Sequence, residues 1–290
     1  MATNTPFGQR LGLVLEGGAM RGIYTAGVLD VFLEAGIMPD VVVGVSAGAL
    51  HGCGYVAGQK GRSIRYYRKY RSDKHFMGLY SLLTTGDVVG TKFCYEDIPL
   101  RLDPFNEAAF EKAPVDFYVT VTNVRTGKPE YILCDELKVG SKMDVIRAGA
   151  SMPLCSKMVE WNGNLYLDGG VSDSIPYAKM KDFGCRKSIV VLTQPAGYLK
   201  QPAAMAPFEA MYRKYPAFVE AMRGRDQMYN TEVCAVEQAA KQGDVFLIRP
   251  SKLLHVGRME HDIEVLNAQY ELGRQDARNQ MDAMREWMER

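Results

Sequence analysis

The strongest constraint on how this chain can fold is the alternation of apolar runs and helical patterns in its first sixty residues. A short apolar run at 11–15 ends near a pair of glycines, and residues 23–35 then carry apolar side chains at helical spacing. A second apolar run at 41–45 is followed by small residues up to position 57. Strand, helix, strand and helix in this order predict a parallel sheet with helices covering its faces.

The rest of the chain adds further strands and then becomes mainly helical. It contains no internal repeat and no linker rich in proline or serine, so a single α/β domain with a helical C-terminal part is expected. Strands are predicted at 117–124, 130–134, 165–167, 188–193 and 245–248, and helices at 143–150, 208–223, 227–242 and over much of 262–289.

The composition argues against several classes of function. Thirty-five lysines and arginines face 34 aspartates and glutamates, so the net charge of +1 provides no overall basic field for binding nucleic acid. The six cysteines form no Cys-x-x-Cys pair and have no pair of histidines nearby, which argues against a zinc site and a disulfide framework. We therefore expect free thiols in a reducing cytoplasm, and no bound metal.

A serine follows the second predicted strand within the pattern Gly-x-Ser-x-Gly, which is formed by Gly44, Ser46 and Gly48. A strand before this pattern and a helix after it are the setting of a nucleophile elbow. The glycines allow a sharp turn, and the start of the helix favours negative charge developing on the serine oxygen. Ser46 is therefore a candidate nucleophile, although a turn of small residues can also contain serine by chance.

A glycine-rich turn, residues 16–22, follows the first predicted strand. Its backbone N–H groups are expected to converge on one point, which suits an anion. A dinucleotide site is excluded, because Ala19 occupies a required glycine position and no acidic residue ends the second strand. The carboxyl ends of the first two parallel strands share one edge of the sheet. We therefore expect the turn to form an oxyanion hole beside Ser46.

A third motif, an aspartate and two glycines at 168–170, ends the short strand predicted at 165–167. By itself it is typical of an Asp-Gly turn. In order and spacing, the glycine-rich turn, the serine motif and this motif together resemble the patatin-like phospholipase family. The resemblance extends through 148–153 and 171–176 and covers roughly residues 10–195. It implies a three-layer α/β/α fold with a mainly parallel central sheet.

The resemblance also implies roles for individual residues. Ser46 is expected to be the nucleophile and Asp168 the base of a Ser-Asp dyad that hydrolyses lipid esters through an acyl-serine, without a metal or organic cofactor. Two positions depart from the family pattern: Ala19 replaces a glycine, which affects the choice of donor amide, and Ser174 replaces an asparagine, which weakens support for the Asp168 loop. The expected oxyanion hole is Gly17, Gly18 and Ala19, with Arg21, Gly22, Gly44, Gly48, Gly169 and Gly170 in supporting positions.

Residues 1–200 are therefore expected to form a patatin-like catalytic domain, and residues 201–290 a mainly helical extension packed on it. The resemblance implies a phospholipase A or lysophospholipase-like activity, but it specifies neither the head group nor the acyl chain. It assigns no role to the extension. The apolar, glycine-punctuated segment 76–99 is expected either to cap the acyl site or to form ordinary core.

Two other functions remain open. His255 and His261 follow the serine late enough for either to complete a Ser-His-Asp triad of the α/β-hydrolase type, although Ser46 comes early for that fold. Outside catalysis, the alternative is a lipid-binding protein that has lost turnover, although the reactive positions are intact.

Residues 60–75 suggest contact with a lipid surface. The segment carries seven lysines or arginines against one aspartate, interleaved with tyrosines, which suits an anionic membrane. The alternative is a solvated helix whose tyrosines pack inward. With Lys60–Lys74 as the contact, we expect a cytoplasmic protein that binds peripherally to the inner membrane surface. The sequence indicates no oligomeric state.

Overall fold

A computed structural model describes residues 6–290, so the first five residues of the expected catalytic domain lie outside it. Its strands are β1 (Arg10–Leu15), β2 (Val41–Val45), β3 (Asp116–Asn123), β4 (Pro129–Leu133), β5 (Val159–Trp161), β6 (Asn164–Asp168), β7 (Cys185–Val191) and β8 (Val245–Ile248). They form an eight-stranded sheet in the order β5-β6-β3-β2-β1-β7-β8, with β4 also paired to β3. From β3 to β8 the neighbours along this order are parallel, whereas β4 and β6 run antiparallel to β3.

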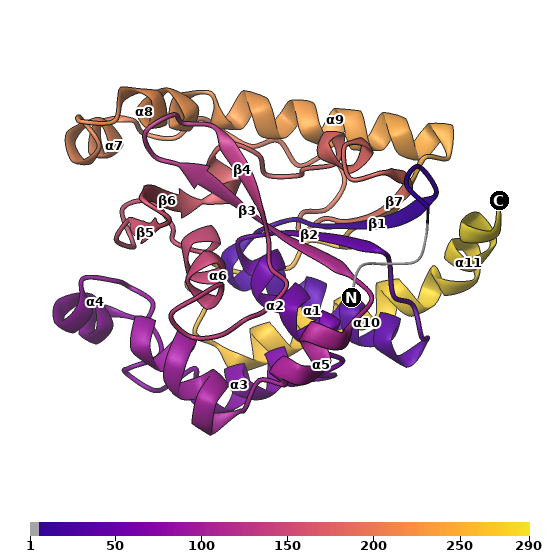
Figure 1. Ribbon diagram of the computed structural model, residues 1–290, viewed down its shortest axis with the longest axis horizontal. Coiled ribbons are helices and arrows are strands. Elements are labelled where there is room, and N and C mark those ends of the chain that lie inside the picture. Colours follow the sequence, from indigo (N-terminus) through magenta and orange to yellow (C-terminus); the bar gives the residue numbers. More distant parts are fainter. Residues whose placement is uncertain (1–5) are drawn as a thin grey trace.

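Helices cover both faces of the sheet (Figure 1). One layer contains α7 (Ala206–Met211), α8 (Pro216–Arg223) and α9 (Arg225–Gln242). The opposite layer contains α1 (Ile23–Glu34), α2 (Ala47–Val56), α5 (Glu107–Lys112), α6 (Met143–Gly149) and α10 (Ile263–Asn279), with α11 (Met281–Glu289) beyond it. Shorter segments are η1 (Ala19–Gly22), α3 (Arg62–Tyr70), α4 (Leu79–Thr85), the π-helical η2 (Phe93–Leu102), η3 (Gly169–Val171) and η4 (Ala178–Lys181).

The burial of the strands explains the two layers. Successive side chains of a strand point to opposite faces of the sheet. Leu13 and Leu15 accordingly join the core that includes α1 and α2, whereas Val14 joins the core that includes α9. The expected three-layer α/β/α fold with a mainly parallel sheet is confirmed.

The C-terminal helix α10 packs directly against α1. A Cβ atom added to Gly27 would lie 2.1 Å from the carbonyl oxygen of Tyr270, and one added to Gly273 would lie 2.1 Å from that of Tyr24. The two backbones therefore approach so closely that only glycine fits at both positions. The hydroxyl of Tyr24 also donates a hydrogen bond of 3.0 Å to Asp276 of α10. Residues from both ends of the described chain thus share one core.

One predicted helix was wrong in extent, because it is divided in two. The helix expected at 208–223 is interrupted before Pro216, where Tyr215 has a φ of −129° and a ψ of 67°, outside the helical region. A residue before proline is sterically driven away from helical angles. The helical structure expected over much of 262–289 is present as α10 and α11, which meet at Gln280.

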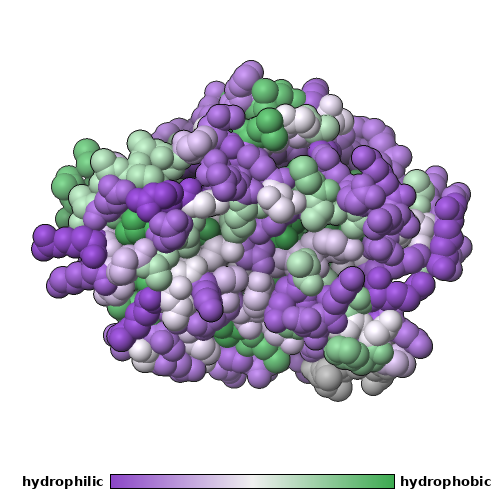
Figure 2. Space-filling model, turned by 90° about the horizontal axis from the view of Figure 1, so that it is seen from above, coloured by the Kyte–Doolittle hydropathy of each residue, from purple (hydrophilic) through white to green (hydrophobic). Residues whose placement is uncertain are grey.

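The side of the molecule that carries α9 is mainly hydrophilic, with smaller apolar patches among charged residues (Figure 2). Between residues 6 and 290, no helix combines the length and the apolar character that a membrane crossing requires.

Candidate active site

Ser46 lies at the sharp turn between β2 and α2. Its backbone has a φ of 53° and a ψ of −122°, and its side chain is buried, with 8% exposed. Such angles are strained for a residue with a side chain and are typical of functional turns. The flanking glycines permit the turn: a Cβ at Gly44 would lie 2.5 Å from the Ala49 Cα, and a Cβ at Gly48 would lie 2.3 Å from the Leu15 oxygen. The local geometry is that of a nucleophile elbow.

Asp168 ends β6 and faces Ser46. The Ser46 hydroxyl donates a hydrogen bond of 2.6 Å to Oδ2 of Asp168, and Oδ1 accepts one of 2.8 Å from the Gly170 N–H. Burial raises the pKa of Asp168, while the Ser46 hydrogen bond and the charge of Arg225 oppose this effect. The carboxylate is thus a stronger base than an exposed aspartate and is already aimed at the serine proton.

The loop that carries Asp168 is held by several side chains. Thr122 donates to the Asp168 carbonyl at 2.8 Å, and both Ser174 Oγ, at 2.9 Å, and Arg225 Nε, at 2.5 Å, donate to the Gly170 carbonyl. The expected loosening at Ser174 is therefore not seen, because its hydroxyl bonds the loop directly. Gly169 lies against β3, where an added Cβ would be 2.2 Å from the Thr120 oxygen.

The glycine-rich turn lies against the serine, as the shared sheet edge predicts. A Cβ at Gly17 would lie 2.7 Å from Cβ of Ser46, and one at Gly22 would lie 2.6 Å from Cβ of Ala47. Within residues 6–290, the N–H groups of Gly17, Gly18 and Ala19 donate no backbone hydrogen bond. They are thus free to bind an oxyanion. Ala19 adopts a φ of 48°, a left-handed conformation usually left to glycine.

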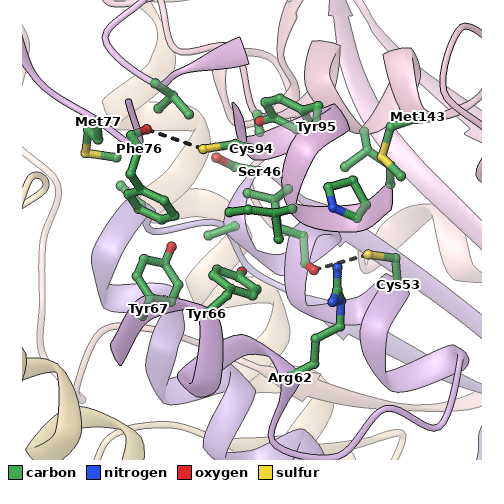
Figure 3. A pocket seen from close by; sticks show the side chains of 18 of the residues that line it. Ser46, Cys53, Arg62, Tyr66, Tyr67, Phe76, Met77, Cys94, Tyr95 and Met143 are labelled. Carbon is green, nitrogen blue, oxygen red and sulfur yellow. Dashed lines mark hydrogen bonds between the residues drawn. The ribbon is translucent and has the colours of Figure 1, made fainter. Parts of the chain in front are cut away.

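An apolar cavity of about 120 Å³ opens on one side of Ser46. Tyr66, Tyr67, Phe76 and Tyr95 lie around it together with Ser46 (Figure 3). The segment expected at 76–99 either to cap the acyl site or to form core contributes much of this lining. A cavity of this chemistry suits an acyl chain.

A polar cavity of about 180 Å³ opens on the other side of Ser46. Both cavities are lined by Ser46, Ala19 and Met152, so the serine stands at their junction. The polar cavity also contains Asp168, Gly17, Gly18, Glu16 and the basic residues Arg21, Lys200, Arg225 and Arg258.

No histidine lines either cavity within the described part of the chain. His255 and His261 are exposed. His51 is buried in α2, where its Nδ1 contacts the Ser63 hydroxyl at 2.9 Å, and burial lowers its pKa to about 4. The hydrogen-bond partner of Ser46 is a carboxylate, so this geometry gives the triad alternative no support. Nor does any part of residues 6–290 bring together three histidine, cysteine or acidic side chains as a metal would require.

The basic segment 60–75 forms α3 and its flanks. Its tyrosines Tyr66 and Tyr67 pack inward around the apolar cavity. Arg62 pairs with Asp103 at 2.7 Å and Arg65 pairs with the same carboxylate at 2.6 Å. Two of the basic side chains of this segment, Arg62 and Arg65, therefore stabilise the wall of the cavity by pairing with Asp103.

Sequence reasoning missed Glu16 and the residues that the C-terminal part contributes to the site. Glu16 is buried, and its carboxylate accepts hydrogen bonds from the Tyr229 hydroxyl at 3.0 Å and from the Thr193 N–H at 2.5 Å. Burial raises the pKa of Glu16. Arg225 and Lys200 reach the polar cavity from beyond the recognised motifs. The only sequence signal was the position of Glu16 directly before Gly17.

A family model described as patatin-like phospholipase matches residues 13–180, more than half of the chain. The chain belongs to the patatin-like phospholipase family. A second model, described as a domain of unknown function (DUF6363), matches residues 215–289 of this patatin-like protein. That part includes α9 and α10, which pack on the patatin-like fold.

Curated relatives extend the comparison. The uncharacterized protein YjjU of Escherichia coli is 28% identical over 273 residues, covering 91% of this patatin-like chain and 75% of its own. The lysophospholipase nte1 of Aspergillus terreus is 30% identical over 182 residues, covering 61% of this chain, and that of Saccharomyces cerevisiae is 30% identical over 190 residues, covering 63%. This chain spans only 11% of either lysophospholipase. The solved structure of VipD from Legionella pneumophila superposes with a TM-score of 0.48 at 13% identity, covering 96% of this chain and 67% of that one.

Proposed function

We propose that this chain is a serine acylhydrolase that cleaves carboxylic ester bonds of lipids, in the manner of a phospholipase A or a lysophospholipase. The observation that carries the proposal is the 2.6 Å hydrogen bond between Ser46 and a buried Asp168, located where an apolar and a polar cavity meet. Membership of the patatin-like phospholipase family and relatives named lysophospholipase support a lipid hydrolase.

In the first half of the proposed reaction, Ser46 Oγ attacks the ester carbonyl carbon while its proton passes to Oδ2 of Asp168. The carbonyl oxygen becomes an oxyanion, which the N–H groups of Gly17, Gly18 and Ala19 stabilise. The tetrahedral intermediate then expels the alcohol oxygen, which takes the proton from Asp168, and an acyl-serine is left.

In the second half, Asp168 takes a proton from water as the water oxygen attacks the acyl carbon. The new oxyanion collapses, Ser46 Oγ leaves and recovers the proton, and the carboxylic acid is released. The two attack steps need Asp168 as an ionised carboxylate that accepts a proton, and the two collapse steps need it as the acid that returns the proton; the raised pKa of the buried Asp168 serves both roles. The scheme uses no metal and no organic cofactor.

We test the dyad with Ser46→Ala, Asp168→Asn and the double variant, each measured on a panel of lysophospholipids, phospholipids, glycerides and short esters. Each single change should lower kcat/KM by about a thousandfold or more, and the double variant should be no worse, because members of one catalytic unit are not additive. Asp182→Asn is the matched control, since Asp182 is exposed and pairs only with Lys179.

A fluorophosphonate that labels activated serines provides a second test, which does not depend on knowing the substrate. It should modify Ser46 in the wild-type protein and no residue in Ser46→Ala. A folded Ser46→Ala protein with full turnover would refute the assignment. If the wild-type protein binds lipid but neither reacts with the probe nor hydrolyses any ester, the silent lipid-binding alternative is correct.

We further propose peripheral contact with a lipid surface, as expected for Lys60–Lys74, with its apolar part provided by α4. This helix exposes Leu79 by 69% and Leu83 by 77%. It projects from the body of the molecule beside the segments that line the apolar cavity (Figure 1). Lys69 and Lys74 are exposed nearby in sequence, a combination that suits an anionic interface.

A further inference from the structure

The loop that follows Asp168 is anchored to α9 by the carboxyl group of Glu232. Oε2 of this group accepts hydrogen bonds from the N–H of Ser174 at 3.1 Å and from the N–H of Ile175 at 3.0 Å. Glu232 lies in α9, within the region 215–289 that matches the domain of unknown function. Two backbone donors of the loop thus depend on an acceptor from the C-terminal part.

A short series of hydrogen bonds connects this anchor to the carboxylate of Asp168. The Ser174 hydroxyl donates to the Gly170 carbonyl at 2.9 Å, and the Gly170 N–H donates to Oδ1 of Asp168 at 2.8 Å. Oδ2, the other oxygen of Asp168, accepts from the Ser46 hydroxyl. A catalytic side chain keeps a productive orientation only when its supporting hydrogen bonds are themselves held in place. The direction of the Asp168 carboxylate therefore depends on the position of the loop that Glu232 binds.

Glu232 also forms a hydrogen bond with a second carboxyl group, that of Asp173 in the same loop. Oδ2 of Asp173 accepts a further hydrogen bond from the Tyr131 hydroxyl of β4. An ionised carboxylate only accepts hydrogen bonds, so two carboxyl groups bond to each other only if one of them carries a proton. Glu232 and Asp173 therefore share one proton, which avoids two like charges side by side.

The surroundings of the pair decide which member carries the proton. Burial and the charge of Asp173 raise the pKa of Glu232 to about 9. Burial also raises the pKa of Asp173, but hydrogen bonds from Tyr131 and Glu232 oppose this rise. At neutral pH, Glu232 is thus the protonated member, which donates to Asp173 while it accepts from the loop.

The other titratable and charged groups around the pair come from β4 and η4. Burial and the charge of Asp173 raise the pKa of Tyr131 well above its ordinary value, so this hydroxyl stays a donor. Lys179 of η4 lies 5.3 Å from the centre of the Tyr131 ring and pairs with Asp182 at 2.7 Å. Its charge is therefore directed toward Asp182 and away from the shared proton.

We propose that Glu232 is a positioning residue, which shares a proton with Asp173 and thereby holds the loop in the conformation that directs Asp168 toward Ser46. Glu232 is not among the described residues that line either cavity, so it acts through the loop and not on the substrate. The inference rests on the proposed function and goes beyond it, because it gives the C-terminal region 215–289 a task at the reacting centre.

Two substitutions of Glu232 separate positioning from a general loss of structure. Glutamine has nearly the shape of a protonated glutamate, with an oxygen that accepts from the loop and an amide that donates to Asp173. On a short-chain ester at pH 7, Glu232→Gln should therefore keep kcat within about twofold of the wild-type value. Glu232→Ala should lower kcat by about tenfold to a hundredfold and leave KM nearly unchanged, because the base is misdirected while both cavities remain. Glu237→Ala is the matched control, since Glu237 lies in the same helix but pairs with Arg249 at 2.8 Å.

A pH series tests the shared proton. As the pH rises through about 9, Glu232 loses its proton beside the ionised Asp173, and the two like charges repel each other. The kcat of the wild-type protein should therefore fall above this pH, whereas that of Glu232→Gln should not. Lys200, whose pKa is lowered to about 8 mainly by burial, titrates in the same range in both proteins, so the difference between the two profiles belongs to Glu232.

Stability measurements test the same proton without any substrate. The folded protein keeps the proton of Glu232 up to about pH 9, whereas the unfolded chain releases it near pH 4.5. Between these values the folded state binds more protons than the unfolded state, so the free energy of unfolding falls as the pH rises. Glu232→Gln lacks this proton. Its midpoint of urea unfolding should therefore rise relative to that of the wild-type protein as the pH increases from 5 to 8.5.

The outcomes distinguish the proposal from the function on which it rests. Equal kcat in folded Glu232→Ala and wild-type protein would overturn the proposal, as would a loss in Glu232→Ala that Glu232→Gln shares. An equal loss in Glu237→Ala would also overturn it, because the whole helix would then be responsible. If the stability difference changes with pH as expected but the wild-type protein hydrolyses no ester, the proposed function and the positioning role both fail and the shared proton stands. If esters are hydrolysed but the stability difference is constant, the shared proton is refuted and the proposed function stands.

Discussion

His51 lies in α2, the helix that begins directly after Ser46, and it has an unusual environment for a titratable group. It is 2% exposed, its Nε2 has no hydrogen-bond partner within residues 6–290, and its pKa is lowered to about 4 by burial. In the unfolded chain an imidazole takes up its proton near pH 6.5. The folded protein therefore holds His51 neutral through a range in which the unfolded chain would charge it.

This difference predicts a loss of stability on acidification. The unfolded state binds more protons than the folded state between about pH 6.5 and the lowered pKa of about 4, so the contribution of His51 is complete above this range and falls as the pH drops through it. Relative to His51→Gln, the wild-type protein should lose about 2 kcal/mol of unfolding free energy between pH 7.5 and pH 5. Urea titrations of both proteins at the two pH values measure this change. A difference that does not vary with pH would mean that His51 is solvated.

Some residues of the site could be predicted from sequence and others could not. Ser46 and Asp168 were predicted from short patterns, because an elbow and an Asp-Gly turn each need particular residues at adjacent positions. Lys200, Arg225 and Arg258 lie in three separate segments, and basic residues are common on protein surfaces. Only the three-dimensional packing of these segments reveals that the three cations share one cavity.

Among the secondary-structure elements, α4 is the one whose exposed apolar side chains are least suited to contact with water. Its base is closed by a bridge between Met77 and Val89, and both of these residues line the apolar cavity. The exposed Leu79 thus follows two residues after Met77, which lines the apolar cavity.

We predict that the double variant Leu79→Gln/Leu83→Gln lowers the rate of hydrolysis on anionic phospholipid vesicles by about tenfold, because two exposed apolar side chains no longer enter the bilayer. The rate on a monodisperse short-chain ester should not change, since the variant leaves both cavities intact. Met38→Gln is the control, because Met38 is also exposed but lies before β2, at the opposite edge of the sheet from Ser46. Equal losses on both kinds of substrate would instead indicate a damaged cavity.

The accuracy of the predicted elements follows from the strength of local signals. The runs at 41–45 and 245–248 were predicted with the bounds of β2 and β8, because both runs consist mainly of apolar residues and end abruptly at polar residues on both sides. β5 has only three residues and was missed. A segment this short has little sequence signal of its own, and its pairing with β6 stabilises it as a strand. Pro216 indicates a break before it, but apolar residues at helical spacing on both sides led to the prediction of one continuous helix.

At the scale of the whole molecule, the division into residues 1–200 and 201–290 remains a proposal about sequence. The packing of α10 on α1 connects the two parts, with Gly273 against the backbone of Tyr24. We predict that Gly273→Val lowers the free energy of unfolding by about 3 kcal/mol or more, because two backbones must separate to admit the side chain. Gly257→Ala should have little effect, since the nearest atom to its added Cβ is 3.7 Å away. Urea unfolding measures both, and a stable Gly273→Val protein would show that α10 can shift without cost.

The order of the strands has a consequence for synthesis on the ribosome. β1 lies between β2 and β7, so it acquires its second partner strand only after residues 185–191 have been made, and the wall of the polar cavity is completed later still by Arg258. At roughly 5–20 residues per second, the interval between Ser46 and Gly273 corresponds to on the order of ten to fifty seconds. A nascent chain therefore carries Ser46 long before Tyr229, which donates a hydrogen bond to Glu16 at the start of the glycine-rich turn, has been made. Under the proposed function, newly made copies should become active only after nearly all of the sequence from Ser46 to α10 has left the ribosome, so the time of translation separates the synthesis of Ser46 from its first reaction.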